Sequence, residues 1–337
     1  MKAVVVHGAG HLRVQERATP EPGDGQVLLR IAYGGICGSD LSYFRHGAVG
    51  DFVLREPLVL GHEVVGTVAA DPSGRLPAGA PVTVHPATTC GECELCRSGA
   101  ANVCPKARYL GSAATMPHTQ GGFAEYLLVR DDQVRRLPAG MPLQRGVLAE
   151  PLGVAVHGLA RAGQLAGARV LVNGAGPIGL LTVGAAIEAG AAEVGVSDVL
   201  DRPLRLAEQL GATGTWRVDA EPLPQERFDV VIEASGVPAA IGGALAAVRR
   251  RGVFVQVGLL PGGPQPVALA ALAAREIDMR GAFRFGTEID RAVEMLAGTT
   301  RFDPVITQVF DVADASEAIA VAADPATSSK VVLRFGQ

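Results

Sequence analysis

The chain has 337 residues, enough for about two domains of ordinary size. It carries 30 Lys and Arg against 34 Asp and Glu, a net charge of −4, and it has no dense basic run of the kind that grips nucleic-acid phosphates. Apolar residues make up 48% of the chain, which excludes disorder and leaves a membrane protein to be considered.

A membrane span does not fit the longest stretch without charge, residues 252–274, because the Pro- and Gly-rich turn 261–266 interrupts it. At the N-terminus only residues 3–6 form an apolar run, which is too short for the core of a signal peptide. We therefore expect a cytoplasmic protein with neither a membrane nor a nucleic-acid partner. Its cysteines should serve as ligands or nucleophiles rather than in disulfides.

The first part of the chain has the pattern of β structure. Short runs rich in β-branched residues are separated by turns of Gly and Pro, which predicts a compact β barrel with loops that reach outward. These runs are 27–31, 58–68, 81–85 and 122–129.

From about residue 150, apolar strands alternate with helices, which predicts a parallel sheet covered on both faces. The expected strands are 169–173, 193–198, 228–232 and 252–257. The expected helices between them are 177–189, 201–210 and 238–249. The alternation ends after about residue 279, and the remaining segments predict helices at 288–296 and 313–323 and a closing strand at 330–335.

A glycine-rich turn that fits G-x-G-x-x-G follows the first of these strands and opens the next helix. Such a turn lets a pyrophosphate approach the backbone, and the helix N-terminus favours its negative charge. Asp198 ends the next strand, where its carboxylate would bind the adenosine ribose hydroxyls and repel a 2′-phosphate. NAD is therefore the expected cofactor and NADP is less favoured, although Arg202 could accommodate a phosphate. The predicted cofactor-binding residues are Gly174, Gly176, Pro177, Ile178, Gly179, Asp198, Arg202 and Val257.

Four of the five cysteines share one short loop with the spacing C-x2-C-x2-C-x7-C. Four thiolates this close in sequence can complete a tetrahedral shell around Zn²⁺, which predicts a structural zinc loop at 88–106. An iron–sulfur cluster is the alternative, but its usual run has a shorter last gap. A DNA-binding zinc finger would need paired histidines or a basic recognition helix, and the loop has neither. The predicted ligands are Cys90, Cys93, Cys96 and Cys104.

The fifth cysteine, Cys37, would by itself be more typical of a core residue than of a ligand. It gains support from His62-Glu63 at the start of the next β segment and from Glu150 where the second domain begins. One thiolate, one imidazole and one carboxylate make three zinc ligands and leave a fourth position for water or substrate. These residues therefore predict a catalytic zinc site, which makes two zinc ions per chain.

The order and spacing of these motifs resemble the zinc-dependent medium-chain dehydrogenase/reductase family across essentially the whole chain. The shared motifs are Cys37-Gly38-Ser39-Asp40, Gly61-His62-Glu63, the four-cysteine loop, Glu150-Pro151 and the glycine fingerprint. Further segments are similar to the polyol dehydrogenase branch, and within it to the L-idonate 5-dehydrogenases. These segments are 34–41, 110–113, 117–118, 121–123 and 281–285.

The resemblance implies an α/β fold in which a GroES-like β-barrel catalytic domain is joined to a Rossmann domain with a doubly wound parallel sheet. It implies a catalytic domain at 1–149, an NAD-binding domain at 150–282 and a return to the catalytic domain at 283–337. It also implies a homodimer or homotetramer.

The resemblance further implies that Cys37 and His62 bind the catalytic zinc. In this family either Glu63 or Glu150 can be the third ligand; Glu63 is favoured for a site that holds a water, with Glu150 exchanging with it or binding through that water. Asp40 would orient His62 through the other ring nitrogen.

The exit of the substrate proton follows from the same resemblance. Ser39 would touch the substrate hydroxyl and begin the transfer of its proton. Relatives often carry histidine at position 42, whereas this chain has Ser42, so a water chain or His46 would have to complete the route.

The implied reaction is the oxidation of a secondary alcohol of a sugar acid, L-idonate to 5-keto-D-gluconate, with hydride transfer to NAD and zinc as Lewis acid. The guanidinium of Arg284 could pair with the carboxylate of the acid or hydrogen-bond to a neutral polyol. The alternatives are a sorbitol or xylitol dehydrogenase, a threonine-type dehydrogenase and, among non-enzymes, a zinc-stabilised nucleotide-binding protein. The predicted substrate contacts are Tyr43, Tyr109, Phe283 and Arg284.

Overall fold

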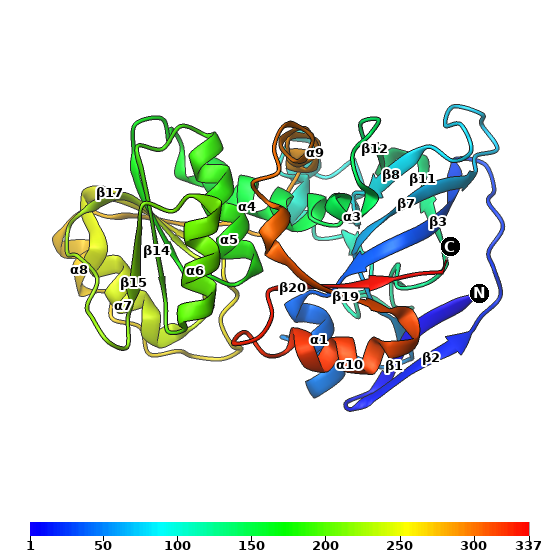
Figure 1. Cartoon of the computed structure of the whole chain (residues 1–337), viewed down its shortest axis with the longest axis horizontal. Coiled ribbons are helices and arrows are strands. Elements are labelled where there is room, and N and C mark those ends of the chain that lie inside the picture. The colour runs from blue at the N-terminus through cyan, green and yellow to red at the C-terminus, as the bar shows by residue number, and fades with distance from the viewer. Residues whose placement is uncertain (337) are drawn as a thin grey trace.

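The computed structural model describes residues 1–336 and contains two large sheets, one in each half of the molecule (Figure 1). The half that holds both termini contains a seven-stranded, mostly antiparallel sheet with the order β12-β8-β7-β3-β20-β19 and with β11 paired to β3. Its strands are β3 (Gln26–Gly35), β7 (Glu63–Ala70), β8 (Pro81–Val84), β11 (Tyr126–Arg130), β12 (Val134–Arg136), β19 (Ile306–Asp311) and β20 (Lys330–Arg334).

Smaller strands and short helices surround this sheet. A three-stranded sheet contains β1 (Lys2–Gly8), β2 (His11–Glu16) and β6 (Leu58–Val59), and two short pairs contain β4 (Ala48–Val49) with β5 (Phe52–Val53) and β9 (Ala87–Thr88) with β10 (Arg108–Tyr109). The helices on this side are α1 (Gly38–His46), α2 (Glu94–Arg97), α3 (Leu143–Gly146) and α10 (Ala315–Ala322).

The other half contains the predicted parallel sheet, with the strand order β15-β14-β13-β16-β17-β18. Its strands are β13 (Arg169–Asn173), β14 (Glu193–Asp198), β15 (Gly214–Arg217), β16 (Phe228–Glu233), β17 (Val248–Gln256) and β18 (Asp278–Gly281). The helices of this half are α4 (Ala149–Ala162), α5 (Pro177–Glu188), α6 (Asp201–Leu210), α7 (Pro238–Ala247), α8 (Ala270–Ala274) and α9 (Glu288–Gly298). The expected combination of a GroES-like barrel and a Rossmann sheet is thus confirmed.

Alternation along β13 shows why both faces of the parallel sheet are covered. Val170 and Val172 belong to the core that includes α4, α5 and α9, whereas Leu171 belongs to the core beneath α7. Successive side chains of a strand point to opposite faces, so a continuous apolar run supplies two cores at once.

The sequence pattern did not predict the two edge strands of this sheet, β15 and β18. The side chains of both strands are half-buried or exposed, so neither strand has the continuous apolar run that marks the central ones. The helix predicted at 238–249 ends at Ala247, and β17 begins at the next residue rather than at Gly252.

The β segment predicted at 58–68 is broken into β6 and β7 at Leu60, Gly61 and His62. Gly61 has φ +94°, and a Cβ at this position would lie 2.1 Å from the ring of Phe123. Only glycine can occupy a left-handed conformation this close to another side chain. The break places His62 just before β7 and Glu63 at its first residue, where a continuous strand would have carried both into the sheet.

The chain returns to the barrel sheet through β19 and β20, which lies antiparallel beside β3. Before that return, α9 packs on α4. The division of the chain into domains at 1–149, 150–282 and 283–337 stays a prediction. No helix within residues 1–336 combines the length and the hydropathy that a bilayer crossing requires.

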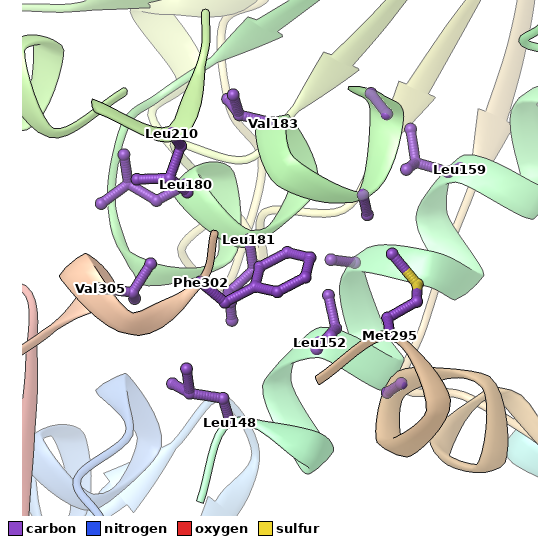
Figure 2. Close-up of a cluster of buried hydrophobic side chains, with 14 of the residues drawn as sticks. Leu148, Leu152, Leu159, Leu180, Leu181, Val183, Leu210, Met295, Phe302 and Val305 are labelled. Atoms are coloured by element: carbon purple, nitrogen blue, oxygen red, sulfur yellow. The ribbon is translucent and has the colours of Figure 1, made fainter. Parts of the chain in front are cut away.

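Phe302 lies in the core where α4, α5 and the segment after α9 meet (Figure 2). Its ring lies near the labelled side chains of Leu181 and Val305, and it is fully buried. A Cβ at Gly184 would lie 2.4 Å from this ring, so the glycine makes room for it. The core therefore depends on the close packing of the Phe302 ring against Gly184, which has no side chain to occupy the same space.

We expect Phe302→Ala to lower the free energy of unfolding by about 3–5 kcal/mol, because it leaves a cavity that its neighbours cannot fill. The matched control is Val309→Ala on β19, whose side chain is 38% exposed and should cost no more than about 0.5 kcal/mol. Denaturant unfolding of both variants measures the difference. Equal midpoints for the two variants would contradict the prediction.

Candidate active site

Cys37, His62 and Glu63 come together because β3 and β7 are paired antiparallel with Gly35 opposite Glu63. Cys37 follows the end of β3 and caps the N-terminus of α1, while His62 immediately precedes β7 and Glu63 is its first residue. One thiol, one ring nitrogen and one carboxylate oxygen from these residues all lie within 4.8 Å of one another. A soft sulfur, an imidazole and a carboxylate oxygen this close fit a zinc ion.

The environment of His62 favours a positive charge. Burial by itself would lower the pKa of this imidazole, but the negative charges of Cys37, Glu150 and Asp40 outweigh that effect and raise the pKa to about 10. The electrostatics that would hold a proton here also attract a divalent cation. The donor set and its charge therefore both fit a metal ion.

Asp40 is fully buried and accepts two hydrogen bonds from the backbone. Its oxygens bind the N–H of Cys37 at 2.9 Å and the N–H of Gly61 at 3.1 Å. Burial raises the pKa of Asp40, and the charge of His62 and the two N–H groups oppose that rise. Within residues 1–336 no hydrogen bond joins Asp40 to the His62 ring; its two bonds join the loops that carry Cys37 and His62, and its role in orienting His62 stays a prediction.

Glu63 has a partner that the sequence analysis missed. Lys330, at the start of β20, donates to both carboxylate oxygens at 2.7 and 2.6 Å and to the carbonyl of Ile36 at 3.1 Å. The Lys330 side chain is 2% exposed and that of Glu63 is fully buried. Burial raises the pKa of Glu63 to about 7, although Lys330 acts in the opposite direction. The only signal in the sequence was a lysine that opens an otherwise apolar closing strand.

Glu150 lies at the start of α4 and belongs to a second cluster beside the first. The hydroxyl of Tyr109 donates to its Oε1 at 2.6 Å, and the Tyr109 ring meets the His62 ring edge-on at 5.5 Å. Glu150 is not a member of the mutually close group formed by Cys37, His62 and Glu63. Burial of the Tyr109 hydroxyl and, after it, the negative charge of Glu150 raise the pKa of Tyr109 well above the usual value.

Arg284 completes this second cluster. Its guanidinium carbon lies 4.1 Å from the centre of the Tyr109 ring and 4.8 Å from that of Phe283. Three of the four predicted substrate contacts thus lie together with Glu150. The fourth, Tyr43, is buried in the barrel core, where its hydroxyl accepts the N–H of Ala113 at 2.9 Å, but it still lies close enough to act electrostatically on the Arg284 guanidinium.

The remaining predictions on this side concern α1. Ser39 is half-buried in its first turn. The Ser42 hydroxyl donates to the carbonyl of Ala48 at 2.7 Å, and His46 is exposed at the end of the helix. The Ser42 side chain therefore stabilises the turn that follows α1.

The four cysteines of the loop also form a compact group. The sulfur–sulfur distances are 3.9 Å for Cys90–Cys96, 3.9 Å for Cys93–Cys104 and 3.6 Å for Cys90–Cys104. Four sulfurs at ~2.3 Å from a tetrahedral zinc would lie about 3.8 Å apart. All five cysteines of the chain are free. This geometry fits a metal ion enclosed on all four sides.

The glycine-rich turn forms a cradle at the carboxyl edge of the parallel sheet. Gly174 has φ +99°, and a Cβ at this position would lie 2.7 Å from the backbone of Ser235. A Cβ at Gly179 would lie 1.8 Å from the carbonyl of Gly174, whereas Gly176 faces open space. The first and third glycines thus permit the turn, and the second leaves room for a ligand at the N-terminus of α5.

Three further residues were predicted to bind the cofactor, and one of them, Asp198, contacts this turn directly. Asp198 accepts the N–H of Ala175 at 2.8 Å and that of Leu200 at 3.0 Å. The Nη1 atom of Arg202 is buried without a hydrogen-bond partner. Val257 follows the end of β17 and donates its N–H to the carbonyl of Glu233 at 2.9 Å.

Glu233 is a second residue that the sequence analysis missed. It ends β16 fully buried and accepts hydrogen bonds from the N–H of Ser235 at 2.8 Å and from the Gln256 amide at 2.5 Å. Its carboxylate therefore joins the loops that follow β16 and β17, beside the glycine-rich turn. A charged residue at the end of an apolar strand was the available signal.

We expect Lys330→Met to destabilise the chelator-treated protein by about 3–5 kcal/mol, because it leaves the Glu63 carboxylate buried and unpaired. The loss should be larger at pH 8 than at pH 5.5, since a carboxyl group with a raised pKa takes up a proton as the pH falls. The double variant Lys330→Met/Glu63→Gln should recover part of the loss. Urea unfolding at both pH values measures these effects. A Lys330→Met variant as stable as the wild type would show that Lys330 does not stabilise the buried Glu63 carboxylate.

Comparison with known proteins agrees with this geometry. Residues 23–139 match the family model "Alcohol dehydrogenase GroES-like domain", and residues 177–298 match "Zinc-binding dehydrogenase". The chain is 38% identical to L-idonate 5-dehydrogenase (NAD(P)(+)) of Escherichia coli, over 99% of this chain and 98% of that protein. It is also 38% identical to sorbitol dehydrogenase of Gallus gallus, over 94% and 91% of the two chains.

The fold agrees as well. The crystal structure of L-idonate 5-dehydrogenase from Escherichia coli superimposes with a TM-score of 0.95 at 37% identity, over 99% of this chain and 98% of that one. Two family models in the expected order, and relatives matched along almost their whole length, confirm the resemblance drawn from the motifs. The chain belongs to the zinc-type medium-chain dehydrogenase family.

Proposed function

We propose that this dehydrogenase oxidises a secondary alcohol of a sugar acid, L-idonate to 5-keto-D-gluconate, with hydride transfer to NAD. The observation that carries the proposal is Arg284, whose guanidinium lies against Tyr109 beside Glu150. Within residues 1–336 it forms no ion pair, and burial lowers its pKa. The charge of Glu150 acts on this guanidinium, but no carboxylate in the described part of the chain hydrogen-bonds to it, so its N–H groups are suited to binding a carboxylate of the substrate.

Cys37 and His62 would hold the catalytic zinc, with Glu63 or Glu150 as the carboxylate ligand. Zinc bound there supplies a Lewis acid that makes an alcohol easier to deprotonate. The Lys330 ammonium fixes both oxygens of Glu63, which favours Glu63 as the stationary ligand and leaves Glu150 free to exchange.

The other residues orient the substrate and carry its proton. Tyr109 holds Glu150 by a hydrogen bond, and Arg284 would bind the carboxylate end of the sugar acid. Ser39, half-buried on α1, would accept the hydroxyl proton and pass it toward solvent. The balance is one hydride to the cofactor and one proton to water, which leaves a ketone.

NAD bound in the cradle of Gly174, Gly176 and Gly179 supplies the hydride acceptor. Asp198 is held beside this turn by the N–H of Ala175, where it would bind the ribose and disfavour a 2′-phosphate. The buried, unpartnered Nη1 of Arg202 acts against a strict preference, since it could meet that phosphate. NAD is therefore the proposed cofactor, with NADP used less well.

A polyol dehydrogenase acting on sorbitol or xylitol is the second candidate, followed by a threonine-type dehydrogenase. The identity to a sorbitol dehydrogenase supports the former. A homodimer or homotetramer stays a prediction from the family, which light scattering would test.

Metal analysis tests the two proposed zinc sites. We expect about two zinc ions per chain in the purified protein and about one in either Cys37→Ser or Cys93→Ser. Cys37→Ser should lose activity with little change in thermal stability, whereas Cys93→Ser should unfold at a lower temperature.

The control for this experiment is wild-type protein treated with a chelator and then reloaded with zinc. About one zinc per chain in the untreated wild type, retained in Cys37→Ser, would favour a zinc-stabilised nucleotide-binding protein over an enzyme.

Substrate recognition is tested with Arg284→Met. We expect kcat/KM for L-idonate to fall about 10- to 100-fold, because a charge-assisted pair is lost, while kcat/KM for sorbitol changes much less. The matched control is Arg291→Met, which removes an exposed arginine that pairs with Glu294 on α9. An equal fall in kcat/KM for both substrates would favour a polyol over a sugar acid as the substrate.

A further inference from the structure

Arg284 lies in a left-handed backbone conformation, which is uncommon for a residue that carries a side chain. Its φ is +52°, in the left-handed region, and it lies in the segment that links β18 to α9. A residue other than glycine at such an angle costs free energy that the surrounding contacts must offset. The neighbours that hold this segment therefore decide where the guanidinium lies.

The first contact comes from the four-cysteine loop. Asn102, two residues before Cys104, donates from its side-chain amide to the carbonyl of Phe283 at 2.9 Å. This bond fixes the peptide group that joins Phe283 to Arg284. The two residues are separated by 181 positions in the sequence, so the bond joins distant parts of the chain.

The second contact comes from the barrel sheet. His85 follows β8, and its Nδ1 accepts the N–H of Ala87 at 3.2 Å. Its Nε2 therefore carries the proton and donates to the carbonyl of Gly286 at 2.7 Å. The same ring meets Phe285 edge-on, with 4.9 Å between ring centres.

The third contact comes from α4. The Glu288 carboxylate accepts the N–H of Gly286 at 2.6 Å and pairs with Nδ1 of His157 at 2.7 Å. His157 lies on α4 seven residues after Glu150, on the same face of the helix. The helix that presents Glu150 to the site thus also anchors the segment that carries Arg284.

We propose that Asn102 is a specificity-determining positioning residue: its amide holds the Phe283 carbonyl so that the Arg284 guanidinium lies over Tyr109, with His85 as the second anchor. This inference rests on the proposed function, in which Arg284 binds the substrate carboxylate. It gives the four-cysteine loop a part in substrate selection, because the loop supplies the amide that fixes the arginine.

The test uses Asn102→Asp, which keeps the shape of the side chain and removes the donor. We expect the KM for L-idonate to rise about tenfold with kcat changed less than about twofold, because the carboxylate contact is weakened before the chemical step. The KM values for sorbitol and NAD should stay within about twofold. His85→Gln is the second variant and should change the KM for L-idonate in the same direction.

A double-mutant cycle isolates the link to Arg284. In the Arg284→Met background, Asn102→Asp should add no further loss, since the group it positions is gone. The matched control is Gln308→Ala, which removes another amide-to-carbonyl bond, 3.0 Å long, at Thr327. Zinc content equal to that of the wild type shows that the cysteine loop is intact.

Failure of this inference and failure of the proposed function give different results. Suppose that Arg284→Met lowers kcat/KM for L-idonate selectively, and that Asn102→Asp causes the same further loss in the Arg284→Met background as in the wild type. The positioning role is then wrong and the sugar-acid assignment stands. If Arg284→Met impairs both substrates equally, the sugar-acid assignment is wrong. The positioning role then stands only if Asn102→Asp raises both KM values and adds nothing in the Arg284→Met background.

Discussion

One buried carboxylate, that of Asp40, joins the two loops from which the site is built. Asp40 accepts the N–H of Cys37 and the N–H of Gly61, and so joins the end of β3 to the turn that precedes His62. These are the two loops that carry the thiol and the imidazole. A buried carboxylate is tolerated only when its hydrogen bonds are made. Separation of the two loops would leave the Asp40 carboxylate buried without these bonds, at a large cost in free energy. The close approach of sulfur and ring nitrogen follows from that constraint.

Both halves of the molecule supply polar side chains to this region. α4 presents Glu150 beside Tyr109, and β20 presents Lys330 to Glu63. Each buried carboxylate thus meets a partner that comes from a distant part of the chain. Since an unpaired buried charge is strongly destabilising, these pairs stabilise the arrangement of the barrel and α4 as well as the chemistry.

The sequence predicted the parts of this structure that are local. The glycine turn, the four-cysteine loop and the Cys37 and His62 motifs each carry their chemistry within a few residues, and the central strands have unbroken apolar runs. It did not predict Lys330, because its bond to Glu63 spans 267 positions and leaves no local pattern. The resemblance placed Asp40 near His62 but did not predict its hydrogen bonds to the N–H groups of Cys37 and Gly61, because backbone partners leave no mark on the motif. The edge strands β15 and β18 were missed because half-exposed strands lack the apolar signal.

The position of Lys330 in the chain separates it from Glu63 during synthesis as well as in sequence. Ribosomes make proteins from the N-terminus, so Cys37, His62 and Glu63 leave the ribosome long before the strand that neutralises Glu63. β20 pairs with β3 and carries the ammonium that meets Glu63, so one late segment supplies both a strand of the sheet and the partner of this acid. A nascent chain without β20 therefore carries Cys37, His62 and Glu63 but not the buried lysine that pairs with Glu63.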